Sequence, residues 1–343
     1  MPPTDQPLDA LDRKLLQALQ LDGRVPFSRV AQVLGVSDQT VARRVRRLRE
    51  TAGLRVLGMT DGTRLGRTSW IVRLACAPDV AERLAGALAR RPDTMYVKLV
   101  SGGTEVTCGM RPRSRRERDD LLLGRLQRTP RITSISAHCV LHEFTGGGAT
   151  GWLTKIDALA PDEAAALRPP PPEPAAGPLT LDADDERLLA ALHEDGRRTL
   201  TELQTATALT ETAVRTRLDR LRARGVLYFD VQYDHAPLGQ DVDAFLWLTV
   251  APAHLAAAGA ALAAHPQVQF AAATTGPANL AAATLHTGPA ELYTYLSERV
   301  GALPGVQSVE SVLSLRRVKG LAYRETRPEP DRAGSSGAAG EGR

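Results

Sequence analysis

Residues 37–49 read Ser-Asp-Gln-Thr-Val-Ala-Arg-Arg-Val-Arg-Arg-Leu-Arg. Val41, Val45 and Leu48 recur at the i, i+4, i+7 spacing of one apolar helix face. Ser37 precedes this run, where a helix N-cap is expected. Five arginines occupy the other faces. Because arginine and glutamine can bond base edges and further arginines neutralise phosphates, such a helix is suited to a DNA major groove. A solvated basic surface helix is the alternative interpretation.

The residues before this helix favour DNA binding. Leucines at helical spacing predict a first amphipathic helix over residues 11–19, which ends at an Asp-Gly-Arg turn (residues 22–24). Residues 30–34 predict a short second helix closed by Gly35. Two helices, a tight turn and a basic helix in this order are the helix-turn-helix arrangement.

The same arrangement returns in the second half of the chain. Asp22-Gly23-Arg24 recurs as Asp195-Gly196-Arg197, and Ala77-Pro78 recurs as Ala251-Pro252. The apolar and basic landmarks of the recognition helix also recur: Val41, Arg44, Val45, Leu48 and Arg49 match Val214, Arg217, Leu218, Leu221 and Arg222. Because so many landmarks keep nearly one offset, we interpret the chain as a tandem duplication of a unit of about 145 residues.

Strand-like periodicity follows each helix-turn-helix unit. In the first copy it predicts strands over 69–75, 95–100, 105–110 and 132–144, with helices over 79–91 and 113–129. In the second copy it predicts strands over 244–250, 269–274, 280–285 and 306–315, with helices over 253–265 and 289–302. The order βαββαβ is the ferredoxin-like plan. The expected fold class is α+β, with two winged-type helix-turn-helix units, each followed by a βαββαβ ferredoxin-like domain.

These patterns predict the following segments. Residues 8–57 and 181–230 are the helix-turn-helix units, and residues 65–144 and 238–325 are the ferredoxin-like domains. A proline-rich linker covers 145–180, where three consecutive alanines (164–166) favour a helix. Residues 1–7 and the Gly/Ser/Ala-rich tail 326–343 are expected to be disordered.

Composition excludes several classes of protein. The net charge of the 343 residues is only +4, so any affinity for nucleic acid must come from local patches. The three cysteines have no metal-ligand or disulfide-framework spacing. No apolar run approaches the length of a membrane span, and the N-terminus does not resemble a signal peptide. We therefore expect a cytoplasmic protein without membrane segment, metal or cofactor.

The helix-turn-helix with its Asp-Gly-Arg turn, followed by a βαββαβ domain with a glycine turn between its central strands, resembles the Lrp/AsnC family of bacterial and archaeal transcription regulators. The resemblance covers residues 8–144 and 181–325, so the chain looks like a fused, two-copy form of a unit that most members carry once. It implies a non-enzymatic regulator that binds double-stranded DNA sequence-specifically. It also implies a homo-oligomer, dimer or higher, whose RAM-type ferredoxin-like domains bind a small-molecule effector, commonly an amino acid.

Candidate DNA contacts lie on the two recognition helices. Gln39, Thr40 and Arg43 lie near the N-terminal end, where helix-turn-helix proteins usually contact bases. The full candidate set is Ser37, Gln39, Thr40, Arg43, Arg44, Arg46, Arg47, Thr212, Arg215, Arg217 and Arg220.

Roles within this set differ. Arg46 and Arg47 are expected to contact phosphate or solvent rather than bases. Arg44 and Arg217 match between the copies, and either contact DNA or form ion pairs with acids of the first helix of each unit. Because the second recognition helix also carries Glu211 and Asp219, we expect the first unit to supply most of the DNA affinity.

The resemblance implies effector binding near the glycine turn between the second and third strands. The residues at these turns are Ser101, Gly102 and Glu105 in the first copy, and Thr275, Gly276 and Asn279 in the second. The family often has Asp where this chain has Glu105 and Asn279, so a different ligand is one alternative. A plain hairpin turn without a ligand is the other.

Two further functions stay open. Siroheme decarboxylase subunits look similar to this family, and His138 and His142 share one face of a predicted strand, so a tetrapyrrole enzyme is one alternative. A non-DNA-binding, effector-sensing scaffold is the other. The sequence holds no Gly-rich phosphate loop, HExxH motif or nucleophile elbow. Haem-like absorbance would indicate the enzyme, and salt-dependent retention on DNA would indicate the regulator.

Overall fold

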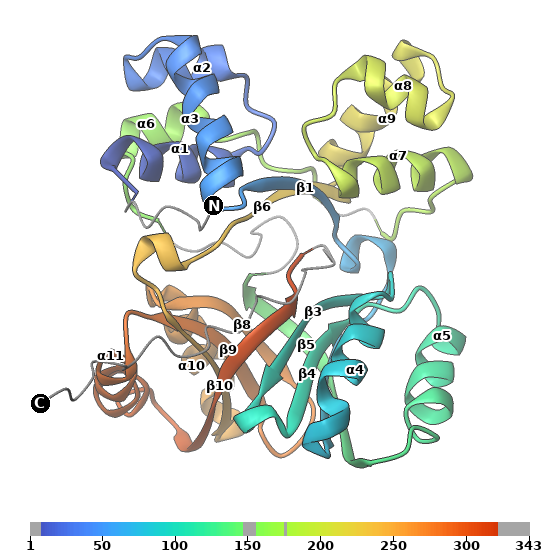
Figure 1. The fold of residues 1–343 in the computed structure, drawn as a ribbon, viewed down its shortest axis with the longest axis vertical. Helices are drawn as coiled ribbons and strands as arrows, with labels where there is room; N and C mark the ends of the chain where they lie inside the picture. Colours follow the sequence, from blue (N-terminus) through green and yellow to red (C-terminus); the bar gives the residue numbers. More distant parts are fainter. Residues whose placement is uncertain (1–7, 147–155, 175–176, 322–343) are drawn as a thin grey trace, which may run out of the picture.

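The computed structural model describes residues 8–146, 156–174 and 177–321, so the predicted disordered segments 1–7 and 326–343 lie outside the described residues. Figure 1 shows two groups of helices side by side at the top and a strand-rich body with outer helices below them. We call the first group head 1 and the second head 2. Among the described residues, no helix is both long and apolar enough to cross a membrane.

Head 1 consists of α1 (Ala10–Leu21), α2 (Phe27–Leu34) and α3 (Asp38–Thr51). Ser37 caps α3 by accepting a hydrogen bond from the backbone N–H of Thr40, as its position predicts. Gly35 ends α2 in the left-handed region, at φ 66°. The predicted apolar face of α3 is buried against the leucines of α1. The three-helix arrangement predicted for this unit is therefore confirmed.

Head 2 repeats the arrangement with α7 (Ala183–Glu194), α8 (Leu200–Thr207) and α9 (Glu211–Ala223). Thr199 and Glu202 form a capping box at the start of α8. Ala208 takes the left-handed conformation that Gly35 takes in head 1, at φ 58°. A residue with a Cβ pays roughly 1 kcal/mol for this conformation relative to glycine, so the turn of head 2 is the more strained of the two.

A two-stranded ladder joins the heads. β1 (Arg55–Thr60) follows head 1, β6 (Leu227–Gln232) follows head 2, and the two pair antiparallel along their whole length. The sequence pattern did not predict these strands, and the predicted domain boundary at residue 57 falls inside β1. Most residues of both strands are buried, so neither strand shows the polar–apolar alternation by which a half-exposed strand is recognised.

The two Asp-Gly-Arg turns lock the heads together across this ladder. Arg24 donates a hydrogen bond to the carbonyl oxygen of Gly196 (2.6 Å), and Arg197 donates to that of Gly23 (2.7 Å). A Cβ added at Gly23 would lie 2.6 Å from Val56 on β1, so only glycine lets the turn pack this closely. The repeated motif therefore has a structural role: it fixes one head relative to the other.

Each ferredoxin-like unit has the predicted order βαββαβ. The first contains β2 (Trp70–Cys76), α4 (Pro78–Ala89), β3 (Thr94–Val100), β4 (Glu105–Met110), α5 (Arg115–Asp119), which continues as a π-helix (Asp120–Arg125), and β5 (Ile132–Thr145). The second contains β7 (Val242–Val250), α10 (Leu255–Ala264), β8 (Val268–Thr274), β9 (Leu280–His286), α11 (Pro289–Thr294), which continues as a π-helix (Tyr295–Val300), and β10 (Val306–Lys319). The predicted fold class is confirmed.

Within the described residues, the eight strands of the two units close into one barrel in the order β10-β3-β4-β2-β5-β8-β9-β7. Closure depends on two long strands. The first half of β5 pairs with β2 and its second half, from Val140, pairs with β8. In the same way β10 pairs first with β7 and then, from Ser314, with β3. The sequence left open whether the units pair within or between chains, and the structure shows pairing within one chain.

The segment predicted as a linker is partly folded onto head 1. It contains α6 (Pro161–Leu167), which includes the three alanines expected to be helical. Leu159 and Leu167 are buried in the core of head 1, and Lys14 of α1 forms an ion pair with Glu163 (2.8 Å). Residues 156–167 therefore belong structurally to head 1, whereas the proline run 169–172 lines a cavity between the two heads.

Candidate nucleic-acid interface and effector region

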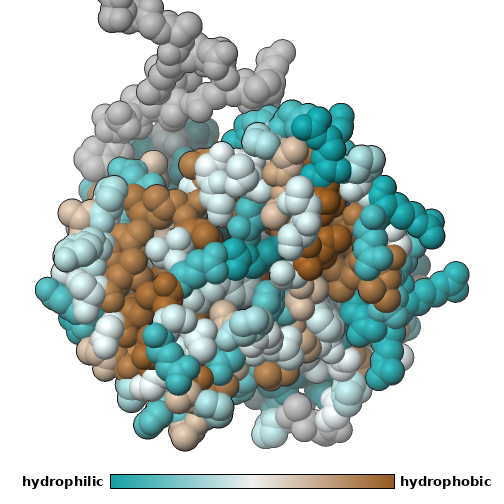
Figure 2. Space-filling view, turned by 90° about the horizontal axis from the view of Figure 1, so that it is seen from below, coloured by the Kyte–Doolittle hydropathy of each residue, from teal (hydrophilic) through white to brown (hydrophobic). Residues whose placement is uncertain are grey.

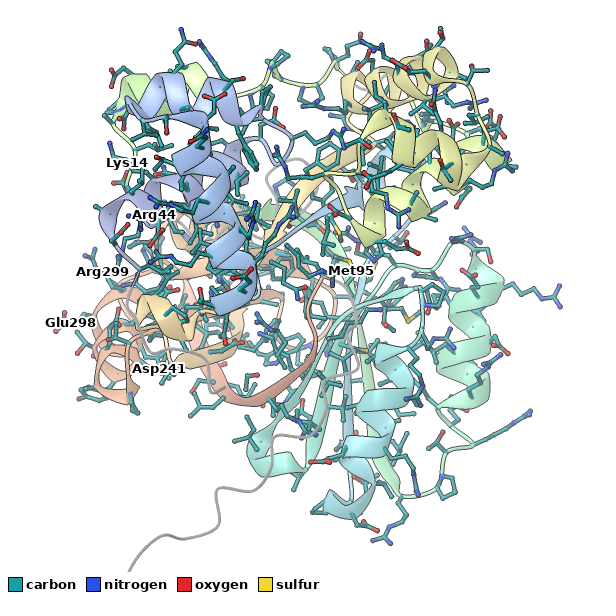
Figure 3. The ribbon with its side chains drawn as sticks, turned by 45° about the horizontal axis from the view of Figure 1, so that its top comes forward. Lys14, Arg44, Met95, Asp241, Glu298 and Arg299 are labelled. Carbon is teal, nitrogen blue, oxygen red and sulfur yellow. The ribbon has the colours of Figure 1, made fainter. Side chains whose placement is uncertain are left out.

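The arginines of α3 fall into two groups. Arg44 and Arg47 turn back toward α1, where both bond the carboxylate of Asp12, and Arg44 also pairs with Asp9. Figure 3 labels Arg44 on the α1 side of head 1. The side chain of Asp12 is 0% exposed, so its charge depends on these two guanidinium groups. Arg44 and Arg47 therefore brace α3 against α1.

Head 2 contains the same brace. Arg217 contacts both Asp182 (2.7 Å) and the buried Asp185 (2.7 Å), and Arg220 contacts Asp185 (2.5 Å). Hydrogen bonds from the backbone N–H of Asp185 and from Arg217 lower the pKa of Asp182. Of the two roles expected for Arg44 and Arg217, DNA contact or an ion pair with acids of the first helix, the structure shows the ion pair. Arg47 and Arg220, which the sequence placed among the DNA contacts, occupy equivalent bracing positions.

The second group of α3 arginines has no internal partner. Arg43 and Arg46 are exposed and form no ion pair with any residue in the described part of the chain. With Gln39 they follow the i, i+4, i+7 spacing, so the three side chains share one exposed face of the helix. We call this face the reading face of head 1. Arg49 is exposed as well, but it lies in the last turn of α3, away from the N-terminal end.

The corresponding face of head 2 has the opposite character. The repeat places Thr216 where head 1 has Arg43, and Asp219 where it has Arg46. Both residues are exposed. A carboxylate at this position would repel DNA phosphates, whereas an arginine attracts them. The difference in charge between the two recognition helices is therefore concentrated on the exposed face, since the braces are alike.

Most of the other residues predicted to contact DNA bond a neighbouring residue of their own helix. The hydroxyl of Ser37 lies 3.0 Å from that of Thr40, and both are part of the N-cap of α3. Thr212 is exposed at the start of α9. Arg215 forms an i, i+4 ion pair with Glu211 (2.8 Å), which reduces its availability for a phosphate.

In the first predicted effector turn, the polar side chains bond to residues of the barrel. Ser101 donates to Glu105 (3.2 Å), and Gly102 has a positive φ of 68° that suits a tight turn. Arg73 holds Glu105 (2.6 Å) and also pairs with Glu310 on β10 (2.7 Å). Ser101 and Glu105 are thus brought together, but the charge of Glu105 is already neutralised by Arg73.

The second predicted turn is also engaged internally. The carbonyl oxygen of Thr275 lies 2.8 Å from Nδ1 of His138, at hydrogen-bond distance. A Cβ added at Gly276 would lie 2.5 Å from the same ring. The side-chain amide of Asn279 bonds both the backbone N–H (2.9 Å) and the carbonyl (2.8 Å) of Val250. Thr275 and Gly276 therefore contact β5 across the seam between the two ferredoxin-like units, whereas the bonds of Asn279 stay within the second unit.

In the barrel order, β2 and β5 lie between β4 and β8, so the two turns are not on neighbouring strands. Arg73, which bonds the first turn, and His138, which contacts the second, both lie against Trp247, at 5.0 and 4.8 Å. Figure 2 views the end of the molecule away from the heads and shows brown apolar areas divided by hydrophilic residues. The effector role predicted for Ser101, Gly102, Glu105, Thr275, Gly276 and Asn279 stays a prediction.

The two histidines considered for a tetrapyrrole pack against different aromatic side chains. His138 packs on Trp247 with ring centroids 4.8 Å apart, and His142 packs edge-on against Phe144 at 4.7 Å. In the described ranges, no group of three or more His, Cys, Asp and Glu side chains could hold a metal ion.

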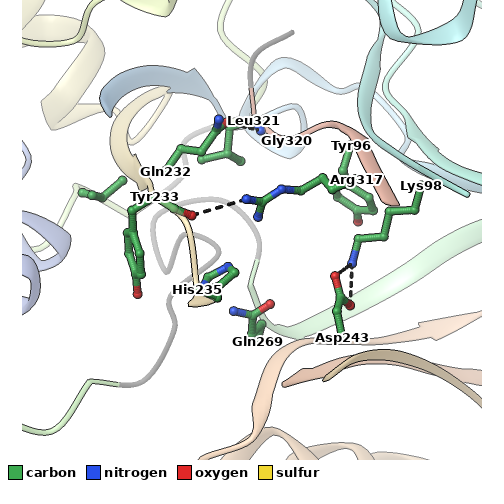
Figure 4. A pocket seen from close by; sticks show the side chains of 11 residues that line it. Tyr96, Lys98, Gln232, Tyr233, His235, Asp243, Gln269, Arg317, Gly320 and Leu321 are labelled. Atoms are coloured by element: carbon green, nitrogen blue, oxygen red, sulfur yellow. Dashed lines mark hydrogen bonds and ion pairs between the residues drawn. The ribbon is translucent and has the colours of Figure 1, made fainter. Parts of the chain in front are cut away.

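A pocket that no sequence pattern predicted lies between the barrel and residues 233–235, the connector that follows β6 (Figure 4). Its volume is about 60 Å³. The lining residues are Tyr96, Lys98, Val231, Gln232, Tyr233, His235, Asp243, Gln269, Arg317, Gly320 and Leu321. They come from β3, β6, β7, β8, β10 and the connector, so no local spacing along the chain could have indicated them.

Burial sets the charge of the histidine in this pocket. Burial lowers the pKa of His235 to about 4, and the nearby Arg317 and Lys98 lower it further against the opposing effect of Asp243 and Asp234. His235 is therefore neutral at pH 7.

This shift predicts that stability falls with acidification. The folded pKa of about 4 lies below the ordinary 6.5, so this contribution is complete above pH 6.5 and is lost as the pH falls toward 4. We expect the lowered pKa of His235 to reduce the free energy of unfolding by about 2 kcal/mol as the pH falls from 7 to 5. Urea unfolding at both pH values should show a loss that is about 2 kcal/mol smaller in His235→Asn and unchanged in His254→Asn, an exposed control. Burial also lowers the pKa values of His193 and His286, so part of the loss remains in every variant. An equal loss in all three proteins would contradict this assignment.

Comparison with known domains and proteins agrees with the repeated architecture. An AsnC-type helix-turn-helix domain matches residues 8–49 and again 181–222, and an Lrp/AsnC ligand binding domain matches residues 243–321. The HTH-type transcriptional regulator FL11 of Pyrococcus horikoshii is 27% identical over 142 residues, which are 41% of this chain and 93% of FL11. The HTH-type transcriptional regulator Rv2324 of Mycobacterium tuberculosis is 32% identical over 140 residues, which are 39% of this chain and 92% of that regulator.

A solved structure resembles the chain over nearly its whole length. The siroheme decarboxylase NirDL superposes with a TM-score of 0.59 at 16% identity, over 92% of this chain and 94% of NirDL. At this identity the likeness shows the fold alone. The twice-matched helix-turn-helix domain, the ligand-binding domain and the regulator relatives show that this chain belongs to the Lrp/AsnC family of helix-turn-helix transcriptional regulators.

Proposed function

We propose that this protein is a sequence-specific DNA-binding regulator in which head 1 reads the operator and the barrel responds to a small-molecule effector. The observation that carries the proposal is the reading face of head 1, where Gln39, Arg43 and Arg46 are exposed together while the neighbouring arginines are committed to the brace. Arginine and glutamine are suited to bidentate contacts with base edges. Such a regulator acts in the cytoplasm, on double-stranded DNA.

Head 2 serves as the weaker partner in this proposal. The ladder β1–β6 and the interlocked Asp-Gly-Arg turns hold it beside head 1, so both heads present to one duplex as a built-in pair. Because Thr216 and Asp219 replace the reading arginines, its contacts are weaker and differ in sequence preference. An asymmetric operator, with one strong and one weak half-site, follows from this difference.

The effector response rests on the ligand-binding domain matched over residues 243–321. An amino acid is one candidate class. Homo-oligomers remain part of the proposal, and because the barrel closes within one chain, they would use surfaces other than the seam formed by β5 and β10.

Fluorescence anisotropy tests the proposal directly. The protein is titrated into labelled duplex from the region upstream of its own gene and into a scrambled duplex, each at two salt concentrations. We expect tighter binding to the upstream duplex and an affinity that falls steeply with salt, since arginine contacts release counterions from phosphates. Weak binding that is indifferent to both sequence and salt would show that the proposal is wrong.

The full-length likeness to NirDL favours one second candidate, a tetrapyrrole enzyme. A cavity of about 890 Å³ between the heads has room for a large ligand. Its charged lining residues are two arginines (Arg168, Arg222) and three carboxylates (Asp22, Glu173, Asp219), a poor match to a tetrapyrrole that carries carboxylate side chains. Soret absorbance that stays with the protein through gel filtration after incubation with an iron porphyrin would support this candidate. If no absorbance elutes with the protein, the DNA-binding regulator remains the proposal.

A further inference from the structure

We propose that the pocket between the barrel and the connector binds a small monocarboxylate anion, and that its occupancy is transmitted to head 1. The regulatory half of this proposal rests on the proposed DNA-binding function and names the place and chemistry of the effector. The binding half can be measured without DNA, so the two can fail separately.

The charged residues of the pocket favour one negative charge. Lys98 bonds both carboxylate oxygens of Asp243, at 2.8 and 2.6 Å, so these two charges cancel. Arg317 is left as the uncompensated cation of the lining. Its one hydrogen bond within the described residues is a long contact of 3.4 Å to the carbonyl oxygen of Tyr233. The remaining guanidinium donors are available for a bidentate carboxylate.

A second, independent feature points to a ligand oxygen. The Nδ1 atom of His235 is buried, and it has no hydrogen-bond partner among the residues that the structure describes. Figure 4 shows the ring of His235 between Arg317 and Gln269, facing the space that they enclose. Buried polar atoms are nearly always paired in folded proteins, and a neutral imidazole can present a donor at Nδ1. An anion held by Arg317 would supply the acceptor.

Size and wall chemistry limit what fits. A cavity of about 60 Å³ admits a ligand of only a few heavy atoms. Tyr96, Val231 and Leu321 give it apolar walls beside the charged end. A compact carboxylate with a short apolar or carbonyl-containing tail satisfies both the charge and the walls, whereas a doubly charged phosphate would exceed the net positive charge of the lining.

The connector links this pocket to head 1. Tyr233 lines the pocket, and its hydroxyl accepts a hydrogen bond from Gln20 of α1 (3.2 Å). The backbone N–H of Asp234 donates to the carbonyl oxygen of Ala52, the C-cap of the recognition helix α3 (2.9 Å). A ligand that draws Arg317 away from the carbonyl of Tyr233 therefore acts on the segment that bonds the C-terminal ends of α1 and α3.

Calorimetric titration of the full chain tests the binding half. The carboxylate probes are sodium acetate, sodium propionate and sodium pyruvate. Sodium phosphate is the competing anion, and sodium chloride at matched ionic strength is the reference. We expect at least one carboxylate to bind, and Arg317→Gln to weaken it by about tenfold or more, as loss of a bidentate charged contact does. Arg316→Gln is the matched control, because Arg316 pairs with Glu82 (2.9 Å) outside the pocket and should leave the affinity unchanged.

A second variant tests transmission to head 1. Gln20→Met changes a residue of α1 that does not line the pocket and removes its hydrogen bond to the hydroxyl of Tyr233, so it should retain carboxylate binding and lose most of the carboxylate-induced change in DNA affinity. Absence of binding by all three carboxylates to the wild type would overturn the site. So would an equal loss of affinity in Arg316→Gln, or tighter binding of inorganic phosphate than of any carboxylate. If carboxylate binds as expected but no duplex is bound, the site stands and the proposed DNA-binding function fails.

Discussion

Replacing Arg43 and Arg46 together by glutamine is expected to lower affinity for the operator duplex about 100-fold, because each specific arginine contact is worth about 1–3 kcal/mol. The salt dependence should weaken as well. The slope of log affinity against log salt should become less negative by about 2 if both side chains neutralise phosphates, and by less if either one contacts bases only. Melting temperature should change little, since neither side chain has an internal partner in the described structure.

The control for this double variant removes the same charge elsewhere. Arg83 and Arg90 are exposed on and just after α4, on the outside of the barrel. Their double replacement by glutamine should leave operator affinity nearly unchanged in the same anisotropy titration. If both double variants lose affinity equally, binding depends on net charge alone, and head 1 has no special reading face.

Replacing Arg44 and Arg47 by glutamine is expected to have the opposite outcome, a large loss of stability. Both bond Asp12, whose side chain is 0% exposed. Removing the partners of a buried charge typically costs about 3–5 kcal/mol, because the remaining charge is left desolvated and unpaired. Urea unfolding followed by helical circular dichroism should show this loss in head 1.

Head 2 offers a replicate of the experiment. Arg217→Gln with Arg220→Gln leaves Asp185 in the same position and should destabilise head 2 by a similar amount. The Arg43 and Arg46 double variant is the matched control, since it changes the same charge on the same helix as the first pair. A stable Arg44 and Arg47 variant that loses only DNA affinity would show that these two side chains contact DNA, contrary to the bracing role.

Adjacent arginines in α3 have different roles, and the sequence could have separated more of them than it did. Arg44 recurs as Arg217, and Arg47 recurs as Arg220, together with the acids that they contact in the first helix of each head. Arg43 and its neighbour on the reading face do not recur. Residues shared by both copies serve the common fold, and residues that differ serve what each copy does separately. Asp12 and Arg47 recur together as Asp185 and Arg220, and this joint recurrence is the sequence signal that identifies Arg47 as part of the brace.

The elements that local patterns predicted are those with one buried and one exposed face. The helix α3 has an apolar stripe and a capping serine, and the strands of both ferredoxin-like units alternate, so their order was predictable. β1 and β6 are buried on both sides and carry no such signal. The last residues of β10 pair with β3 of the other unit, from Ser314 onward, and this partner is more than two hundred residues away in the chain. The pocket at Arg317 was unpredictable for the same reason, because its walls meet only in the folded barrel.

Closing the barrel within one chain changes how the protein responds to its own concentration. Two separate subunits that shared such a barrel would come apart on dilution, whereas β5 and β10 stay paired with the other unit however scarce the protein is. A cell could therefore keep only a few molecules and still have every one assembled. Fusion also allows the two copies to differ in sequence. Head 2 has Asp219 at the position equivalent to Arg46 of head 1, and such a difference is not possible in a symmetric pair of identical chains.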